Sequence, residues 1–409
     1  MRLASTLLSP SKLRKSVSGL SRNVILLGVT SFFADVSSEM IYPLIPVFLT
    51  STLGAPVSVV GLIEGVAEST ASLSKPVAGW FSDRAGRRLP FVVSGYSLGT
   101  AGKLLLAAAT AWPVVLLARF VDRLGKGLRD SPRDALIRDS TTPGLRGRAF
   151  GLHRAMDTGG AVIGPLLGLL LVALLNERLR LVFLIAAVPG FISVLCLSLV
   201  KERRGAAPTT EASGEGLLQR LRSLDRRLKW FLLAALVFSL GNSSDVFLVL
   251  RAKELGLSIT AVVLAYILYN FVYMSTSLPA GIASDYLGRR VVYVGGLLVF
   301  AGVYGGLAVA DDAVFVWPLF AIYGLYIALT DGVSRALISD LAPAESRASA
   351  LGIHGMLTGL ATLFASVLAG QLWDHVGQWA PFAVGAAGAI IGASMLVIVI
   401  PSGRQQSDA

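Results

Sequence analysis

Twelve apolar segments, each long enough to cross a bilayer, constrain the fold of this 409-residue chain more than any other feature. A membrane-spanning helix needs about 20 predominantly apolar residues. Charged residues make up only 15% of the chain, against roughly 25% in soluble proteins. The sequence therefore predicts an all-α membrane protein with twelve transmembrane helices and excludes an ordinary soluble enzyme. The segments lie at 23–50, 57–81, 89–111, 113–137, 147–175, 180–200, 230–250, 258–281, 290–309, 313–339, 347–371 and 377–400.

One long polar stretch, residues 201–229, separates two groups of six segments. Its first part, GAAPTTEASGEG, has the composition of a flexible linker. Its second part, LLQRLRSLDRRLKW, places leucines at helical spacing among arginines, which is typical of an interfacial helix. We expect an N-terminal six-helix bundle at 1–200, a cytoplasmic linker with an amphipathic helix at 201–229, and a C-terminal six-helix bundle at 230–409.

The net charge of +11 is concentrated in the linker and in the loops after the second, fourth, eighth and tenth segments. Positive loops face the cytoplasm, so we expect both termini to be cytoplasmic in a bacterial-type inner (plasma) membrane. This placement argues against nucleic-acid binding. The single cysteine, Cys196, excludes a disulfide scaffold and a thiolate metal site. No spacing indicates a metal site or a cofactor.

An internal repeat relates the two halves. GWFSDRAGRR at 79–88 returns as GIASDYLGRR at 281–290, and DSTTPGLRGRAFGLH from Asp139 returns as DLAPAESRASALGIH from Asp340. Ser37-Ser38-Glu39 in the first segment resembles Ser243-Ser244-Asp245 in the seventh. Two halves with the same direction indicate parallel repeats, which place a substrate site at the midplane between them.

At these residues the chain resembles the major facilitator superfamily, whose loop between the second and third helices carries a motif of the form G-x-L-a-D-r-x-G-r-[RK]. The resemblance implies a secondary transporter of small molecules that works by alternating access, with a cytoplasmic gate latched by this motif. An aspartate there can also stabilise a helix N-terminus. The matching residues are Gly79, Asp83, Arg84, Gly86, Arg87 and Arg88, and in the second copy Gly281, Asp285, Gly288, Arg289 and Arg290.

Two further segments resemble motifs of the superfamily. LLARFVDRLGKG in the fourth segment matches l-x-x-x-R-x-x-q-G-x-g at Arg119, whereas Asp122 and Arg123 depart from the usual glutamine and glycine. The fifth segment resembles the antiporter pattern G-x-x-x-G-P-x-x-G, which implies export. Small residues at this spacing also predict close helix packing. The matching residues are Gly160, Gly164, Pro165 and Gly168.

The fourth segment carries charges at helical spacing, so they form one stripe. Each charge near the centre of a bilayer costs at least about 2.5 kcal/mol, so the stripe must face water or partner charges. We expect Arg119, Asp122, Arg123 and Lys126 in a central cavity. We expect Arg129, Asp130, Arg133 and Asp134 at the cytoplasmic gate, with Asp331 as the repeat mate of Asp130. Candidates to balance the stripe are Asp35, Glu39, Glu64, Glu68, His153 and Asp157.

In the superfamily the first, fourth, seventh and tenth helices line the cavity. This favours Asp35, Glu39 and Asp245, together with the four cavity residues of the fourth segment, as the groups that bind substrate and carry protons. The expected function is proton-coupled efflux of a small organic or drug-like compound by a monomer. Enzymatic catalysis and ATP-driven transport are not indicated, because no catalytic constellation and no P-loop occur.

Three alternatives remain open at this point. A symporter or exchanger of an organic anion would use the cationic stripe, a metal-ion exporter would use Asp35, Glu39 and His153, and a membrane sensor would bind without transport. Carboxylate partners on Arg119 and Arg123 would favour export of a neutral or cationic compound. Arginines without such partners would favour the anion.

Overall fold

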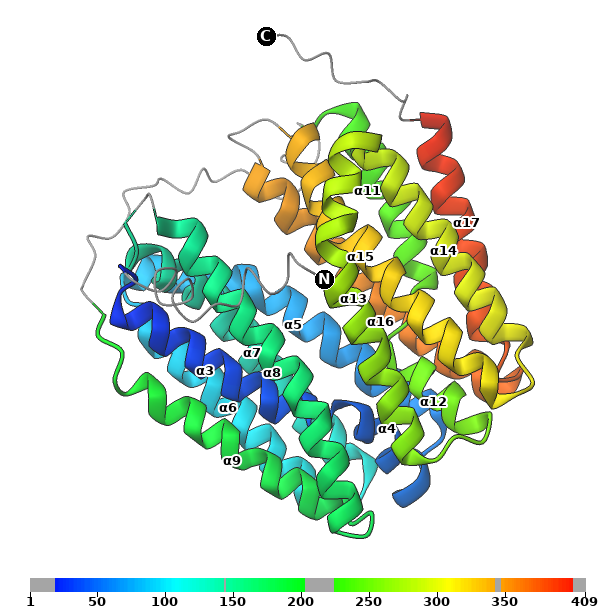
Figure 1. The fold of residues 1–409 in the computed structure, drawn as a ribbon, viewed down its shortest axis with the longest axis horizontal. Helices are drawn as coiled ribbons and strands as arrows, with labels where there is room; N and C mark the ends of the chain where they lie inside the picture. Colours follow the sequence, from blue (N-terminus) through cyan, green and yellow to red (C-terminus); the bar gives the residue numbers. More distant parts are fainter. Residues whose placement is uncertain (1–18, 143–144, 203–223, 343–346, 400–409) are drawn as a thin grey trace, which may run out of the picture. The chain divides into compact units, whose positions relative to one another are not determined.

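The protein is helical throughout the part that the computed structural model describes, residues 19–142, 145–202, 224–342 and 347–399 (Figure 1). The first six spans contain α3 (Arg22–Glu39) with short helices to Thr52, α5 (Val57–Ala85), α6 (Leu89–Ala107), α7 (Trp112–Asp139), α8 (Arg146–Leu174) and α9 (Leu179–Leu197). The last six contain α11 (Arg226–Gly241) with α12 (Val246–Glu254), α13 (Ile259–Leu287), α14 (Arg289–Val309), α15 (Val316–Leu341), α16 (Arg347–His375) and α17 (Ala380–Val399).

Ten helical segments of the described residues are long and apolar enough to cross a membrane. The two further spans, α5 and α7, are less apolar than these ten. Several of their charged side chains form ion pairs with neighbouring helices. The predicted all-α fold with twelve long helices is confirmed.

Two spans that the sequence predicts as continuous are interrupted. After α3 the first span continues as η1 (Tyr42–Leu44), α4 (Ile45–Val47) and the π-helical η2 (Phe48–Thr52). Pro43 and Pro46 explain this break, because proline lacks the amide hydrogen that a helix requires. The seventh span is broken between α11 and α12, where Gly241 to Asp245 are residue types with low helix propensity.

The first half of the predicted amphipathic helix of the linker, residues 217–223, lies outside the described residues. From Arg226 onward the chain already belongs to α11. Asp225 caps this helix, accepting a hydrogen bond from the Arg227 amide at 2.9 Å. The helix of the seventh span therefore begins four residues before the predicted boundary at 230.

The chain divides into two compact units, described separately below. The first comprises residues 1–42, 74–108 and 121–209, and the second comprises 43–73, 109–120 and 210–409. In the first unit α3 packs against α8 and α9, and α6 packs against α9. In the second unit α13 packs against α15, and α14 packs against α15 and α17. The predicted bundles at 1–200 and 230–409 stay a prediction.

In the first unit, glycines of the fifth-span motif bring α8 against α3. A Cβ atom on Gly160 would lie 2.6 Å from the Phe32 carbonyl oxygen, and one on Gly168 would lie 2.3 Å from that of Met40. A Cβ on Gly164 would lie 2.8 Å from the Cβ of Glu39. Only glycine permits this approach. The motif thereby packs against the segment of α3 that carries the two acidic residues of the first span.

In the second unit, the N-terminal part of α5 packs against α16 in a similar way. A Cβ on Gly61 would lie 2.2 Å from the Ser366 carbonyl oxygen. The Asp374 carboxylate accepts hydrogen bonds from the amides of Val57 at 3.2 Å and Ser58 at 2.8 Å. Asp374 thus satisfies free amides at the positive end of the α5 dipole.

Candidate functional site

Three arginines of α7 are shielded from solvent. Arg119, Arg123 and Arg129 are only 4%, 8% and 6% exposed. Charges in such surroundings need partners, because the cost of an isolated buried ion is several kcal/mol. Partners come from α3, α5, α6 and from α7 itself.

A buried, two-point ion pair joins Arg119 to Glu64 of α5, within the second unit. The Arg119 Nε donates to Glu64 Oε1 at 2.9 Å, and its Nη2 donates to Oε2 at 2.6 Å. The side chain of Glu64 is fully buried and that of Arg119 is 5% exposed. This is a bidentate, charge-assisted pair, the strongest geometry that arginine makes with a carboxylate.

A second set of charges lies in the first unit. Lys103 of α6 contacts Asp122 at 3.3 Å, and its ammonium group also donates to the Gly99 carbonyl oxygen at 3.1 Å. Arg123 lies 4.0 Å from Asp122, and its guanidinium stands 5.8 Å from the centre of the Tyr42 ring. Asp122 therefore has a lysine partner on the neighbouring helix.

The acidic pair of the first span lies in the same unit. Asp35 interacts electrostatically with Lys126 and Arg129 of α7 and with Asp157 of α8. Asp157 lies 3.4 Å from the His153 ring. Asp35 therefore has two cations and a second carboxylate of the same unit within electrostatic range.

The gate residues of α7 pair with each other and with α5. Asp130 contacts Lys75 at 3.0 Å and Arg133 at 3.7 Å. Arg133 also donates to the Ser31 hydroxyl at 3.2 Å and contacts Asp134 at 3.0 Å. Through these contacts the C-terminal half of α7 is bonded to α3 and α5 within the first unit.

The repeated loop motif forms the same bridge in each half, through a different arginine. In the first unit Arg88 contacts Asp83 at 3.3 Å and also pairs with Asp139. In the second unit Arg289 contacts Asp285 at 3.4 Å and pairs with Asp340. Asp139 and Asp340 are repeat mates, but Arg289 is the mate of Arg87, not of Arg88. Both copies of the motif therefore have an aspartate–arginine–aspartate bridge, but the arginine of the second copy lies one position earlier in the motif.

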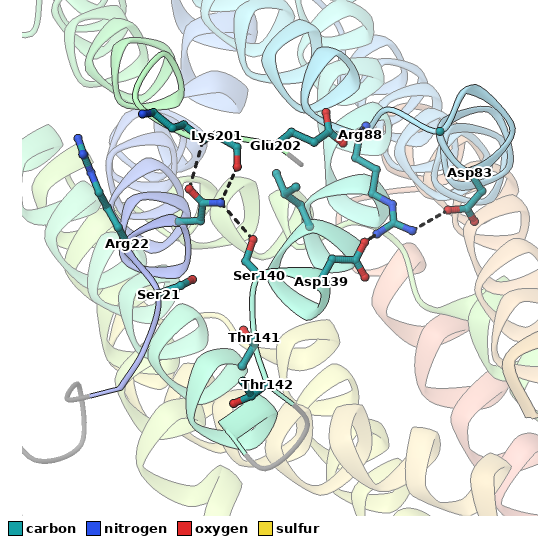
Figure 2. A pocket seen from close by; sticks show the side chains of 13 residues that line it. Ser21, Arg22, Asp83, Arg88, Asp139, Ser140, Thr141, Thr142, Lys201 and Glu202 are labelled. Carbon is teal, nitrogen blue, oxygen red and sulfur yellow. Dashed lines mark hydrogen bonds and ion pairs between the residues drawn. The ribbon is translucent and has the colours of Figure 1, made fainter. Parts of the chain in front are cut away.

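A cavity of 610 Å³ lies beside the first copy of the motif (Figure 2). Glu202 reaches it from the start of the linker and accepts hydrogen bonds from the amides of Arg88 and Leu89, at 2.5 and 3.1 Å. Asn23 donates to the Lys201 carbonyl oxygen at 2.7 Å and accepts from the Lys201 amide at 3.2 Å. The linker start is therefore fixed to the N-terminal ends of α3 and α6.

In the second unit, Asp245 and Asp331 are both bonded by tyrosines. The Asp245 carboxylate accepts from Tyr323 at 2.6 Å and from Tyr269 at 3.2 Å. Asp331 accepts from Tyr273 at 3.0 Å and pairs with Arg335. Among the described residues no group of three or more His, Cys, Asp and Glu side chains is arranged to hold a metal ion.

The chain belongs to the Major Facilitator Superfamily, whose family model matches residues 27–251 and 231–408. An uncharacterised MFS-type transporter of Methanocaldococcus jannaschii is 38% identical, over 93% of this chain and 95% of the relative. The multidrug resistance protein MdtH of Aeromonas hydrophila is 27% identical, over 88% and 90%. The protein is therefore an integral membrane secondary transporter of small molecules and not an enzyme.

Solved structures agree with this fold. The nucleoside transporter NupG superimposes with a TM-score of 0.77 at 13% identity, over 92% of this chain and 98% of the other. A peptide transporter, POT, in complex with sulfate gives 0.76 at 15% identity, over 93% and 95%. At these identities the likeness concerns the fold alone.

From the sequence, Glu64 is only a candidate to balance charge and is not among the predicted site residues. Lys103 and Glu202 are not predicted at all. Lys103 is a single lysine in an otherwise apolar third segment, which is a usable signal because such a charge needs a partner. Glu202 carries no such signal, since an acidic residue after a span is common. Nothing in the pattern shows that it caps α6.

Because the bridging arginine differs between the two copies, adjacent arginines should differ in their effect on stability. We expect Arg88→Gln to lower stability by about 1 kcal/mol, because it removes two partly exposed ion pairs, and Arg87→Gln to have almost no effect. In the second copy the order reverses, so Arg289→Gln should be more destabilising than Arg290→Gln. Thermal unfolding of the four purified variants measures this, and equal shifts within each pair would contradict the assignment.

Proposed function

We propose that this protein exports a small organic compound, neutral or cationic, in exchange for protons. The observation that carries the proposal is the buried pair between Arg119 and Glu64. Both guanidinium–carboxylate contacts are made, so the charge of Arg119 is neutralised by the protein itself. An anionic substrate would have to displace Glu64 to use this arginine.

Proton coupling follows from how a buried carboxylate behaves. Glu64 is fully buried, and an ionised carboxylate in such a place is stable only while a cation pairs with it. If alternating access moves Arg119 away, Glu64 takes up a proton. When the pair forms again, the proton is released. Asp35, Glu39 and Asp122 are further carboxylates among the proposed cavity groups, with Arg123, Lys126 and Asp245.

Export is favoured by two independent observations. The fifth span carries the antiporter-like pattern at Gly160, Gly164, Pro165 and Gly168, and the resemblance to this pattern favours export. The relative named MdtH is a multidrug resistance protein, and its similarity extends over most of both chains. Together these support efflux of a drug-like compound over uptake.

We further propose that both termini and the linker face the cytoplasm, as the distribution of lysine and arginine indicates. The Asp83–Arg88–Asp139 and Asp285–Arg289–Asp340 bridges then lie at the cytoplasmic gate, together with Asp130, Arg133 and Asp331. We propose that the protein works as a monomer in the plasma membrane, as two bundles joined by the linker 201–229.

Transport measured against a proton gradient tests this proposal. Proteoliposomes with an acidic lumen and an internal pH dye receive a lipophilic cation such as tetraphenylphosphonium, a neutral drug, or benzoate as the anion. We expect the lumen to become alkaline with a cation or a neutral compound and not with benzoate, and protein-free liposomes to remain acidic. Co-movement of protons with benzoate would instead favour the organic-anion symporter. No proton movement with any compound would favour the sensor.

A further inference from the structure

The second structural unit contains segments from both halves of the sequence repeat. Its first-half segments are residues 43–73 and 109–120, which include the N-terminal parts of α5 and α7. The remainder of both helices belongs to the first unit. The N-terminal part of α5 is therefore grouped with helices of the second half, although the rest of the same helix is not.

α16 is a second-half helix that this part of α5 contacts. A Cβ atom on Gly65 would lie 2.9 Å from the Leu363 carbonyl oxygen, and one on Gly370 would lie 2.7 Å from the Ser58 Cα. Residue numbers that rise along α5 thus meet numbers that fall along α16, so the two helices are antiparallel. α16 itself packs against α11, α15 and α17, which all belong to the second half. The α5–α16 contact therefore joins one half of the repeat to the other.

A carboxylate completes this contact at the start of α5. Asp374 lies in the last turn of α16, and its two oxygens accept hydrogen bonds from the amides of Val57 at 3.2 Å and Ser58 at 2.8 Å. The first amides of a helix lack partners within the helix and carry partial positive charge. Such amides are normally capped by the residue just before the helix. Here the cap comes from the other half of the repeat.

The position of this contact gives it a role in transport. In secondary transporters built from two repeats, access alternates largely by rigid-body movement of one repeat against the other. A contact between first-half and second-half helices near one membrane surface must break when that side opens. The contact lies at the end of α5 opposite the loop motif, because Val57 begins this helix and Asp83 is near its end.

We propose that Asp374 is a latch, which holds the α5–α16 end of the transporter closed in this structure and releases α5 when that end opens. Both hydrogen bonds are exposed to solvent, so water can replace the carboxylate at the amides, and the net contribution of such bonds is modest. A buried ion pair would be far costlier to separate. The bonds are therefore weak enough to open in every cycle and strong enough to bias the equilibrium between the closed and open states.

Labelling of a buried cysteine tests the latch. The reporter is Ser366→Cys in a Cys196→Ser background, since Ser366 is 0% exposed and its carbonyl oxygen lies against Gly61. Full-length protein in nanodiscs reacts with a water-soluble maleimide, which reaches this thiol only when the α5–α16 contact opens. We expect slow labelling with Asp374 present and a rate about threefold to thirtyfold higher with Asp374→Ala, the range that follows from losing a helix cap. Asp374→Asn, whose amide oxygen still accepts, should label nearly as slowly as the parent.

A second variant removes the latch from the other side. Val57→Pro deletes one of the two donating amides, and proline is well tolerated at the first position of a helix. Its labelling rate should also rise, while its unfolding temperature should stay near that of the parent. This variant decides the question if Asp374→Ala does not fold.

Two controls separate opening of the latch from general loosening of the protein. Asp312→Ala removes a capping bond of the same kind, made at 2.8 Å to the Val314 amide, but within the second half, so it should leave the labelling of Ser366→Cys unchanged. Ala389→Cys is a second reporter, fully buried in α17, which packs against α11 and α14. Its labelling rate should be the same with and without Asp374→Ala.

Three results would overturn the proposal. They are no labelling of Ser366→Cys before the protein is denatured, an unchanged rate with folded Asp374→Ala and Val57→Pro, and an equal rise in rate with Asp312→Ala. The labelling needs neither a substrate nor a proton gradient. It can therefore succeed or fail whatever the transport experiment shows about proton-coupled export.

Discussion

Arg119→Gln is expected to destabilise the protein by roughly 3–5 kcal/mol, because it leaves the Glu64 carboxylate buried and unpaired. Glu64→Gln should also be destabilising, since it removes the bidentate partner of the guanidinium. The double variant Glu64→Gln, Arg119→Gln should recover most of this loss, because it removes both charges together. Thermal and denaturant unfolding of the three purified variants give the coupling energy of the pair.

A matched substitution shows whether the stability loss is specific to a buried arginine or follows the removal of any paired arginine. Arg335 also pairs with a carboxylate, but its side chain is 59% exposed. Arg335→Gln should therefore cost no more than about 1 kcal/mol. If Arg119→Gln is as mild as Arg335→Gln, or if the double variant is worse than either single one, the pair does not have the role assigned to it.

Gly168→Ala is the second substitution with a large expected effect. The added Cβ would lie 2.3 Å from the Met40 carbonyl oxygen, and backbone atoms cannot yield as a flexible side chain can. We expect a loss of about 1–3 kcal/mol and a larger loss for Gly168→Val. Because α3 must shift away from α8, proton-linked transport should fall as well.

The control for this prediction lies on the same helix. Gly151 of α8 has no atom within 4 Å of the position where a Cβ would be added. Gly151→Ala should therefore leave stability unchanged or raise it slightly, since alanine favours a helix over glycine. Yield of monodisperse protein and the unfolding temperature compare the two. Equal behaviour of both variants would show that α3 and α8 do not pack as described.

The fold could be predicted from the sequence because the apolar segments and the internal repeat are strong, long-range signals. The breaks in the first and seventh spans could not, since hydropathy treats a span as one segment. Pro43 and Pro46 contain enough information for the first break. The second depends on Asn242 to Asp245, which are tolerated within helices elsewhere.

The site was predictable by residue type and less so by partner. The periodicity of α7 predicts that Arg119, Asp122 and Arg123 form one charged stripe. It does not predict that Arg119 pairs with Glu64 or that Asp122 pairs with Lys103. Partner choice depends on how α5, α6 and α7 are rotated about their axes. Likewise the repeat aligned Arg88 with Arg290, whereas a one-residue shift gives the bridging role to Arg289.

In the mechanism that we propose, the Glu64–Arg119 pair couples protons to transport. It is tested most directly by comparing two assays on the double variant Glu64→Gln, Arg119→Gln in proteoliposomes. We predict that this variant keeps substrate counterflow, which needs no net proton movement, and loses accumulation driven by a proton gradient. Glu177→Gln, an exposed glutamate after α8, should keep both. Proton-driven accumulation at the wild-type rate in the double variant would contradict the account.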